Sequence, residues 1–462
     1  MKTVLFNLIF VASFVLAKEI VNDVTQLNPI EVETVFQPTT IEQIQEFLKK
    51  KTGKIAIGGG RYSMGGQTAL AGASQIDMRK MNKVVLLDVK NKLVTVEAGV
   101  RWRQLQEAID PHDLSIKIMQ TYSNFTVGGS LSVNVHGRYI GQGPIIRSVE
   151  SIKLVMADGH IEEASPGKNS ELFYGAIGGY GGIGIIVEAT LQLTENTKVE
   201  RTTKSITLDQ YPDYFFKSVR DNSEAVFHNG DLYPPEFKDV IAVTWIKTDK
   251  KLTSAERLIP KDQTYSFQPF AIKMISSSKV AKEIRRSIID PLSYTKSVVV
   301  WRNHEASYDV AELEPKSRSQ TTYVLQEYFV PVKNLKDFVK SVRPILKKTA
   351  FNVVNVSIRH ALPDTGSLLA WAPQEVFSLV IYYKQKTDKK TQKAIAKITQ
   401  DLISEAIKVG GSYYLPYQIH ATEEQFSQAY PRSKEFFALK SKWDPANRLT
   451  NSLWDRYYKP KP

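Results

Sequence analysis

A glycine loop that follows a short apolar run constrains the fold of this 462-residue chain more than any other feature. Residues 58–66 read Gly-Gly-Gly-Arg-Tyr-Ser-Met-Gly-Gly, with five glycines in nine positions. Because glycine has no Cβ, such a loop turns tightly and can direct successive backbone N–H groups at one anion. The loop is not a Rossmann loop, which needs a third glycine at Ser63, and it lacks the Gly-Lys-Ser or Gly-Lys-Thr ending of a P-loop. It predicts a pyrophosphate cradle of another kind or, taken alone, a plain glycine turn.

Two further glycine clusters follow at residues 126–137 and 178–184. The first reads Thr-Val-Gly-Gly-Ser-Leu-Ser-Val-Asn-Val-His-Gly, and the second reads Gly-Gly-Tyr-Gly-Gly-Ile-Gly at the start of a long apolar run. Three such elements suggest a backbone that packs against an extended ligand at several points. The alternative is a tightly wound sheet that needs glycine at its corners.

The N-terminus has the layout of a signal peptide. Lys2 precedes an apolar run from Val4 to Leu16, and Val15 and Ala17 stand at the two positions that a signal peptidase reads. The sequence therefore predicts that residues 1–17 are removed and that the protein is periplasmic or secreted; an uncleaved N-terminal anchor is the alternative. No other stretch is long and apolar enough to span a bilayer, so no stable transmembrane span is expected after cleavage.

Composition narrows the classes of function. Hydrophobic residues make up 42% and charged residues 24% of the chain, which is typical of a globular protein. The net charge is +13, but Lys and Arg are scattered along the chain. We therefore expect no nucleic-acid partner and interpret the positive field as an aid in holding a pyrophosphate. The chain has no cysteine, which excludes disulfides and thiolate metal sites, and no metal site is predicted.

Local patterns predict an α+β domain at residues 18–198. A strand at 32–37, a helix at 41–51 that Thr39 or Thr40 caps, and a strand at 54–57 lead into the glycine loop. Asp158-Gly159 is a strong turn signal and predicts a hairpin. The remaining predictions for this domain are strands at 84–87, 93–96 and 183–193 and a helix at 103–109.

Beyond residue 198, glycine becomes scarcer and aromatic residues denser. The patterns predict a second domain at residues 199–409, with an antiparallel sheet and helices packed on one face. Its strands are predicted at 240–246, 323–330, 352–358 and 376–383, and its helices at 335–347 and 391–409. Residues 410–462 carry a helix predicted at 423–439 and are expected to return to the first domain.

The order of these motifs resembles the vanillyl-alcohol oxidase type of flavoprotein, whose FAD-binding domain is called PCMH-type. The resemblance covers residues 31–200 and 410–458, and it is carried by residues 126–137, by 158–173 and by a tail from Ala429-Tyr430-Pro431-Arg432 to Asp444-Pro445. Within the family it is nearest to the decaprenylphosphoryl-ribose oxidases, followed by the aldonolactone and alditol oxidases. It implies an α+β fold in which a two-subdomain FAD-binding domain is joined to a cap domain.

The resemblance also implies where FAD binds. The pyrophosphate is expected at the first glycine cluster, the other phosphate and the ribityl chain at the second, the isoalloxazine just after it, and the adenine half at the third. These positions are, in that order, Gly58, Gly59, Gly60, Arg61, Tyr62 and Ser63; Thr126, Gly128, Gly129 and Ser130; Asn134, His136 and Gly137; and Gly182, Ile183 and Val187.

The loop departs from the family at Arg61. Many relatives have a histidine there that is joined covalently to the flavin, and others use a cysteine, which this chain lacks. FAD is therefore expected to bind non-covalently, with the Arg61 guanidinium paired to a phosphate. His420 is a remote alternative point of attachment.

The resemblance places four side chains at the redox centre. Tyr417 stands where the ribose oxidases have a lysine, and Arg359 follows Ser357, which replaces a glutamate in the family's Glu-x-Arg step. Gln326 matches a glutamine on the substrate side, and His136 lies within the second glycine cluster. The alternative roles are a core aromatic residue for Tyr417, a surface ion pair for Arg359 and a structural hydrogen bond for His136.

Taken together, the motifs predict an exported FAD-dependent oxidoreductase. It is expected to oxidise a hydroxyl carbon of a sugar, polyol or sugar lactone by hydride transfer to the flavin, with oxygen or a quinone-like compound as acceptor. Two alternatives stay open on the same fold: a flavin-dependent reductase of a carbon–carbon double bond, and a flavin-binding relative without catalysis.

Overall fold

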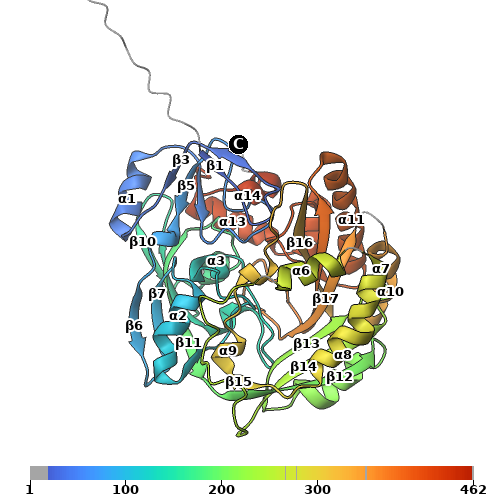
Figure 1. The fold of residues 1–462 in the computed structure, drawn as a ribbon. Helices are drawn as coiled ribbons and strands as arrows, with labels where there is room; N and C mark the ends of the chain where they lie inside the picture. Colours follow the sequence, from blue (N-terminus) through green and yellow to red (C-terminus); the bar gives the residue numbers. More distant parts are fainter. Residues whose placement is uncertain (1–18, 266, 277, 349–350, 460–462) are drawn as a thin grey trace, which may run out of the picture.

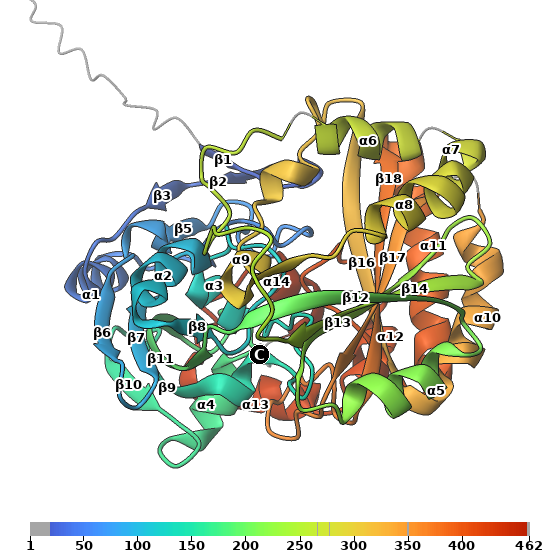
Figure 2. The same cartoon turned by 60° about the horizontal axis from the view of Figure 1, so that its bottom comes forward.

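The computed structural model describes residues 19–265, 267–276, 278–348 and 351–459 (Figure 1). The predicted signal peptide, residues 1–17, lies outside the described residues. The N-terminal elements, blue to teal in Figures 1 and 2, lie beside a large sheet whose strands run from green to orange. Within the described ranges, no helix has the length and apolar character that crossing a membrane requires.

A three-stranded parallel sheet leads into the glycine loop. Strands β3 (Thr34–Phe36) and β4 (Ile55–Gly58) both pair with β5 (Ser74–Asp77), and helix α1 (Ile41–Lys50) connects β3 to β4. Thr40 caps α1, as expected, by accepting the N–H of Gln43. The predicted strand at 32–37 is two short strands, because β2 (Ile30–Val32) pairs with β1 (Glu19–Val21) rather than continuing into β3.

A second, antiparallel sheet forms the rest of the N-terminal half, with the strand order β10-β9-β11-β7-β6 and with β8 paired to the end of β11. The hairpin predicted at Asp158-Gly159 is confirmed, and Gly159 has the positive φ of +93° that its turn needs. The strands are β6 (Val84–Asp88), β7 (Leu93–Glu97), β8 (Leu114–Ile116), β9 (Val149–Val155), β10 (Ile161–Ala164) and β11 (Ile185–Glu195), and the helices between them are α2 (Trp102–Ile109), α3 (Val127–Ser132) and α4 (Ser170–Ala176).

An eight-stranded antiparallel sheet dominates the other half, as predicted, in the order β15-β12-β14-β13-β17-β18-β16-β19. Four of its strands lie where the sequence places them: β14 (Asp239–Lys247), β16 (Thr321–Pro331), β17 (Asn352–Ala361) and β18 (Val376–Lys386). The others are β12 (Lys198–Thr207), β13 (Ala225–Leu232), β15 (Val299–Trp301) and β19 (Ser412–Tyr413), which the C-terminal segment adds to the edge of the sheet.

Helices lie against both faces of this sheet. The predicted helices α10 (Leu335–Leu346) and α11 (Lys389–Lys408) cover one face, and α5 (Tyr211–Phe215) joins the same core. On the opposite face, Tyr294 packs against Ile241 and Val243 of β14. These two side chains point away from the core that α10 and α11 cover. The elements near that face, which the sequence patterns do not predict, are α6 (Phe267–Ile275), α7 (Lys279–Ile284), α8 (Asp290–Tyr294) and α9 (Arg302–Glu305).

The prediction of a single C-terminal helix at 423–439 is wrong in one respect. The structure has two helices, α12 (Glu423–Ala429) and α13 (Ser433–Trp443), and a last helix α14 (Ser452–Tyr457). Pro431 lies in the break, where its missing N–H and its ring oppose a continuous helix.

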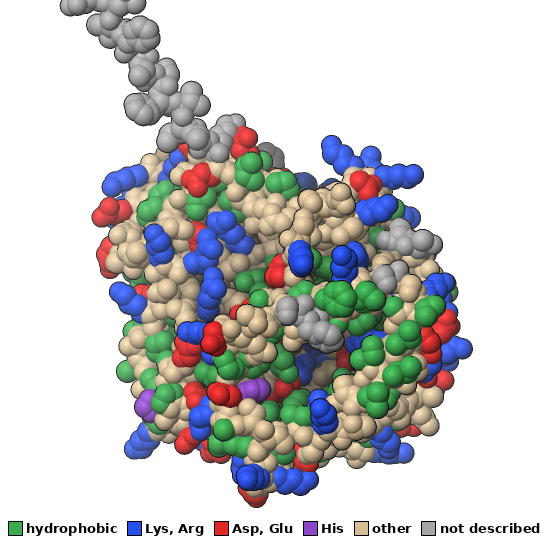
Figure 3. Space-filling model, in the orientation of Figure 1, with side chains coloured by type: hydrophobic (Ala, Val, Ile, Leu, Met, Phe, Trp, Pro, Cys, Tyr) green, Lys and Arg blue, Asp and Glu red, His purple; other side chains and the backbone are tan. Residues whose placement is uncertain are grey.

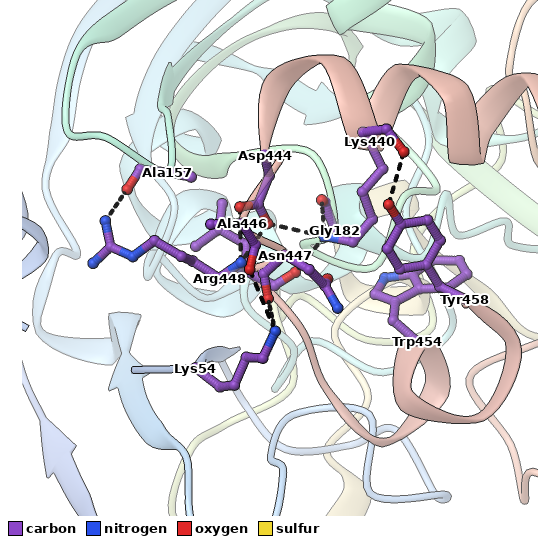
Figure 4. A network of polar contacts seen from close by, with 12 residues as sticks. Lys54, Ala157, Gly182, Lys440, Asp444, Ala446, Asn447, Arg448, Trp454 and Tyr458 are labelled. Carbon is purple, nitrogen blue, oxygen red and sulfur yellow. Dashed lines mark hydrogen bonds and ion pairs between the residues drawn. The ribbon is translucent and has the colours of Figure 1, made fainter. Parts of the chain in front are cut away.

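A buried network fastens this C-terminal segment to the N-terminal half (Figure 4). The Lys440 ammonium donates to the carbonyls of Gly182 at 2.9 Å and Leu449 at 2.7 Å, and it pairs with Asp444 at 3.0 Å. The Arg448 guanidinium donates to the carbonyl of Ala157 at 2.5 Å. The tail therefore helps to hold the third glycine cluster in place.

Candidate functional site

Two adjoining cavities lie where the glycine clusters meet the large sheet. The larger, of about 1250 Å³, is bounded by the glycine loop on one side and by β16, β17 and β18 on the other. The smaller, of about 580 Å³, continues from it towards the third glycine cluster. Both are lined by Gly59, Ser63, Thr68, Thr126, Gly129 and Val133, so that together they form one elongated space.

The glycine loop forms a wall of this space because it leaves β4 directly against the start of α3. A Cβ on Gly59 would overlap the Thr126 hydroxyl, so only glycine allows this approach. Among the described residues, the backbone N–H groups of residues 59–63 have no hydrogen-bond acceptor, although all five residues line the larger cavity. Five consecutive unsatisfied donors beside a cavity are the arrangement that binds an anion. Gly58 lines the smaller cavity.

Arg61 occupies the loop with a positive φ of +61°. Its guanidinium donates to Gln75 at 2.7 Å and pairs with Asp77 at 3.3 Å, and Arg79 pairs with the same carboxylate. Burial lowers the pKa of Arg61, and the Asp77 charge opposes that effect. Arg61 lines the cavity as predicted, but in this structure its charge is paired within the protein.

The second glycine cluster lies opposite the loop. Thr126 caps α3 by accepting the N–H of Gly129, and a Cβ on Gly128 would lie 2.6 Å from the Ala98 Cβ. Thr126, Gly129, Ser130 and His136 line the larger cavity, and Gly128 lines the smaller one.

Two predicted residues of this cluster lie away from both cavities. The Asn134 amide donates to Asp364 at 2.9 Å, and its backbone carbonyl accepts the indole N–H of Trp371 at 2.9 Å. Gly137 lies tightly against the carbonyl of Met119. Both residues therefore support the backbone around His136 and do not line either cavity.

The third cluster reaches the smaller cavity through residues other than those predicted. Tyr180, Gly181, Gly184 and Ile186 line that cavity. Gly182 offers its carbonyl to Lys440, as Figure 4 shows, while Ile183 and Val187 are fully buried in the core. The segment is the expected one, but the alternation of β11 turns Val187 away and Ile186 towards the space.

A buried carboxylate, Glu327 on β16, is the centre of the polar groups in the larger cavity. Its Oε1 lies 2.6 Å from His136 Nε2 and accepts the Ser378 hydroxyl. Its Oε2 accepts the Tyr417 hydroxyl at 3.2 Å. The structure therefore brings together side chains from the second glycine cluster, the large sheet and the C-terminal segment.

Strand register explains how Arg359 joins this cluster. Across β16, β18 and β17, Glu327 is level with Val380 and Ser357, and the next row on the same face holds Phe329, Ser378 and Arg359. Arg359 lines the cavity, and its buried Nε has no hydrogen-bond partner among the described residues. A cavity-facing cation with an unsatisfied donor is suited to bind an acceptor atom of a ligand.

Charge and burial set the protonation of the cluster. Burial raises the pKa of Glu327, but the interactions with His136, Arg359 and the Ser378 hydroxyl together outweigh burial, so the pKa is lowered and the group stays a carboxylate. Burial and the neighbouring Glu327 raise the pKa of Tyr417 well above its usual value. Burial lowers the pKa of Arg359, and Glu327 counteracts it. The cluster therefore has an ionised acceptor beside a neutral phenol and a cation.

Gln326, the predicted substrate-side residue, does not reach the cavity. It is 3% exposed and lies on the opposite face of β16, where its neighbour Tyr328 packs on Phe338 of α10. Glu327 is not among the residues predicted from the sequence, although the alternation of side chains along β16 indicates it. The cavity-lining side chains of β16 are Tyr323, Leu325 and Glu327, at every second position.

Part of the chain matches a known protein family. Residues 32–165 match the model of a family described as an FAD binding domain. Along 92% of its length the chain is 23% identical to L-gulonolactone oxidase from Bos taurus, of which the match covers 95%. It is 27% identical to a mitochondrial L-galactono-1,4-lactone dehydrogenase from Brassica oleracea, over 58% of this chain and 46% of that protein.

A third relative matches a shorter region more closely. The chain is 36% identical to decaprenylphosphoryl-β-D-ribose oxidase from Mycolicibacterium smegmatis over 144 residues, which are 31% of each protein. Among the residues that the structure describes, no group of His, Asp and Glu side chains is arranged to hold a metal ion. The site's chemistry is thus that of a buried carboxylate, a phenol, an imidazole and a guanidinium beside a glycine-lined cavity.

Proposed function

We propose that the chain, whose residues 32–165 match an FAD binding domain, is an FAD-dependent oxidoreductase that oxidises the hydroxyl carbon of a sugar lactone, sugar or polyol. The observation that carries the proposal is the Glu327 cluster. It supplies an ionised acceptor for a proton in the same cavity that the glycine loop lines.

The residues present fit FAD. The unsatisfied N–H groups of residues 59–63 are suited to a pyrophosphate, and the elongated space offers room for a dinucleotide between the first and third glycine clusters. Arg61 offers no nucleophile for a covalent link, and His420 lines neither cavity. We therefore infer that FAD binds non-covalently through the loop.

FAD, when bound, accepts a hydride from a carbon that bears a hydroxyl group. The oxidation also releases the hydroxyl proton, and Glu327 is the group to receive it, because it is ionised and lies within the cavity. Tyr417 donates to the second oxygen of Glu327 and positions the carboxylate. Arg359 is placed to donate to a carbonyl or hydroxyl oxygen of the substrate, which fixes the orientation of the reacting carbon.

The relatives support the substrate class. Two of them are named for oxidation of aldonolactones, and the similarity to the first runs along most of both chains. A lactone has a ring oxygen, a carbonyl and several hydroxyls, which suit the donors and acceptors of the cluster. Oxygen and a quinone-like compound are the two classes of final acceptor. The apolar run at Val4–Leu16 supports export of the protein, with Lys18 as the first residue of the mature chain.

Anaerobic reduction of the FAD-loaded protein tests the proposal. The absorbance of the oxidised flavin should disappear on addition of an aldonolactone or a polyol and return when oxygen or a soluble quinone is added. Bleaching by NADPH and by none of these substrates would instead identify a reductase. A flavin that no lactone, sugar or polyol reduces would contradict the proposed activity.

A further inference from the structure

In one helical segment at the surface, apolar side chains face solvent and several charged side chains face the protein. Helix α7, the π-helical segment η5 (Arg285–Ile289) and α8 run on continuously, and none of their side chains is buried. Val280, Ile284, Ile288 and Leu292 recur at every fourth position and are 68%, 43%, 53% and 64% exposed. Residues four apart lie on one face of a helix, so these side chains form an apolar ridge in contact with solvent.

Three charged side chains of the same segment, Lys282, Arg285 and Asp290, point to the protein body. Lys282 donates to the Asn352 side chain at 2.7 Å, and Arg285 donates to the carbonyl of Val354 at 3.3 Å. Asp290 pairs with Arg285 at 3.0 Å and accepts the Tyr233 hydroxyl at 2.8 Å. A helix that faces water buries its apolar side and exposes its polar side. At these three charged side chains and along the apolar ridge the segment does the opposite, which indicates that its outer face is covered by a partner.

Helix α6 extends the same surface with Phe270, which is 57% exposed. Figure 3 shows hydrophobic side chains gathered over α6 and over the run from α7 to α8. We call this surface the apolar patch; its residues are Phe270, Val280, Ile284, Ile288, Ile289 and Leu292. Contiguous exposed apolar surface of this kind marks an interaction site rather than the ordinary scatter of exposed residues.

The patch is surrounded by positive charge. Residues 267–296 contain six Lys and Arg against two Asp and Glu, an excess of four positive charges. Lys273, Lys279 and Lys296 form no ion pair with any residue that the structure describes. A second copy of the chain on this surface would bring two such positive faces together, which is unfavourable, whereas an anionic surface would neutralise them.

We propose that the apolar patch docks the protein on the surface of an anionic lipid bilayer. The apolar side chains insert at the boundary between headgroups and acyl chains, and the surrounding lysines contact the lipid phosphates. Helix α6 packs against η6 (Val310–Leu313), whose Val310 and Leu313 line the larger cavity. Docking through the patch therefore brings the rim of the cavity to the bilayer.

Vesicle sedimentation with the full chain tests the proposal without any measurement of redox activity. The wild-type protein and the variant Val280→Ser/Ile284→Ser/Ile288→Ser/Leu292→Ser are mixed with vesicles of phosphatidylcholine alone or with one third phosphatidylglycerol. Because these side chains are exposed, the variant should fold normally. The matched control is Val85→Ser/Leu86→Ser, which removes two exposed apolar side chains from β6 on the other half of the molecule.

The wild type and the control should sediment with the anionic vesicles, and added salt should weaken their binding. The partition coefficient of the patch variant should be at least about tenfold lower. Equal sedimentation of the patch variant and the wild type would overturn the proposal, because binding would then reside elsewhere, including in the apolar N-terminal run common to all three proteins. A wild-type dimer in gel filtration that the patch variant abolishes would also overturn it and assign the patch to a second copy.

Discussion

In the proposed function, Glu327 is the residue that accepts the proton from the substrate. The family resemblance directs attention to Ser357, where relatives have a glutamate. In this chain a carboxylate lies on the same face of the sheet, two strands away and level with Ser357. Its contacts with His136 and Tyr417 hold it in place, and His136 helps to lower its pKa.

Replacing this carboxylate tests its role. We expect Glu327→Gln to lower kcat by about 10²- to 10⁴-fold, the range for loss of a general base, while FAD remains bound. Rates of anaerobic flavin reduction and the absorbance of bound FAD measure both effects. Gln326→Met, on the opposite face of the same strand, is the control and should retain most of the activity. A Glu327→Gln protein with normal kcat would exclude this group as the proton acceptor.

Gly59 tests the glycine cradle. A Cβ at this position would overlap the Thr126 hydroxyl, so Gly59→Ala must displace the loop or α3. We expect the Kd for FAD to rise at least about tenfold, which is ~1.4 kcal/mol. Titration of the apoprotein with FAD, followed by flavin fluorescence, measures it. Gly53→Ala is the control, since its Cβ would meet no atom within 4 Å; equal Kd values for the two variants would contradict the cradle.

At the scale of the elements, the C-terminal segment holds the third glycine cluster in place. The side chains of Lys440 and Asp444 are at most 1% exposed, and Lys440 bonds the carbonyl of Gly182 directly. The tail motif that ends at Asp444-Pro445 therefore has a structural role. It fixes the backbone that leads into β11 and the wall of the smaller cavity.

Removing the ammonium should destabilise this connection. We expect Lys440→Met to lower the free energy of unfolding by about 3–5 kcal/mol, because the Asp444 carboxylate is left buried without its partner. Urea unfolding followed by tryptophan fluorescence measures the change. The double variant Lys440→Met/Asp444→Leu should recover part of the loss; a double variant less stable than the single one would show that the pair itself is not the cause.

Sequence patterns located most elements but not the relations between them. Hydrophobic periodicity placed β16, β17 and β18, yet the choice between Gln326 and Glu327 depends on which face of β16 meets the cavity, and only strand register decides that. The helices α7 and α8 escaped prediction because their apolar face is outward and several of their charges are bonded inward. Pro431 was visible in the sequence, and its effect on the helix at 423–439 was predictable.

On the scale of the whole molecule, the sheets of both halves contribute to one site. The parallel and antiparallel sheets of the N-terminal half supply backbone donors, and the eight-stranded sheet supplies the ionisable side chains. The motifs of the glycine clusters are local, and the sequence therefore revealed them. The residues of the large sheet come from positions far apart in the chain. Only the folded structure shows that they lie next to His136.

Global stability should depend on pH through a buried histidine. His228 is 1% exposed, and burial lowers its pKa to about 3. Because the unfolded chain takes up this proton near pH 6.5 and the folded chain does not, stability is present above pH 6.5 and falls as the pH decreases. The expected contribution of His228 to the slope is about 1.4 kcal/mol per pH unit, or about 2 kcal/mol between pH 6.5 and pH 5.

Urea unfolding at a series of pH values measures this dependence. His228→Gln should reduce the slope between pH 6.5 and pH 5 by about one proton, while His160→Gln on an exposed turn serves as the control. The same slope in the His228→Gln protein as in the wild type would place the pH dependence elsewhere.

The flavin content of the purified protein tests the central claim most directly, because every role assigned to the site requires FAD in the glycine cradle. After incubation with FAD and gel filtration, the protein should hold one FAD per chain, and acid precipitation should release all of it into the supernatant. A protein that stays colourless would contradict the FAD site, and yellow colour retained in the acid pellet would contradict non-covalent binding at Arg61.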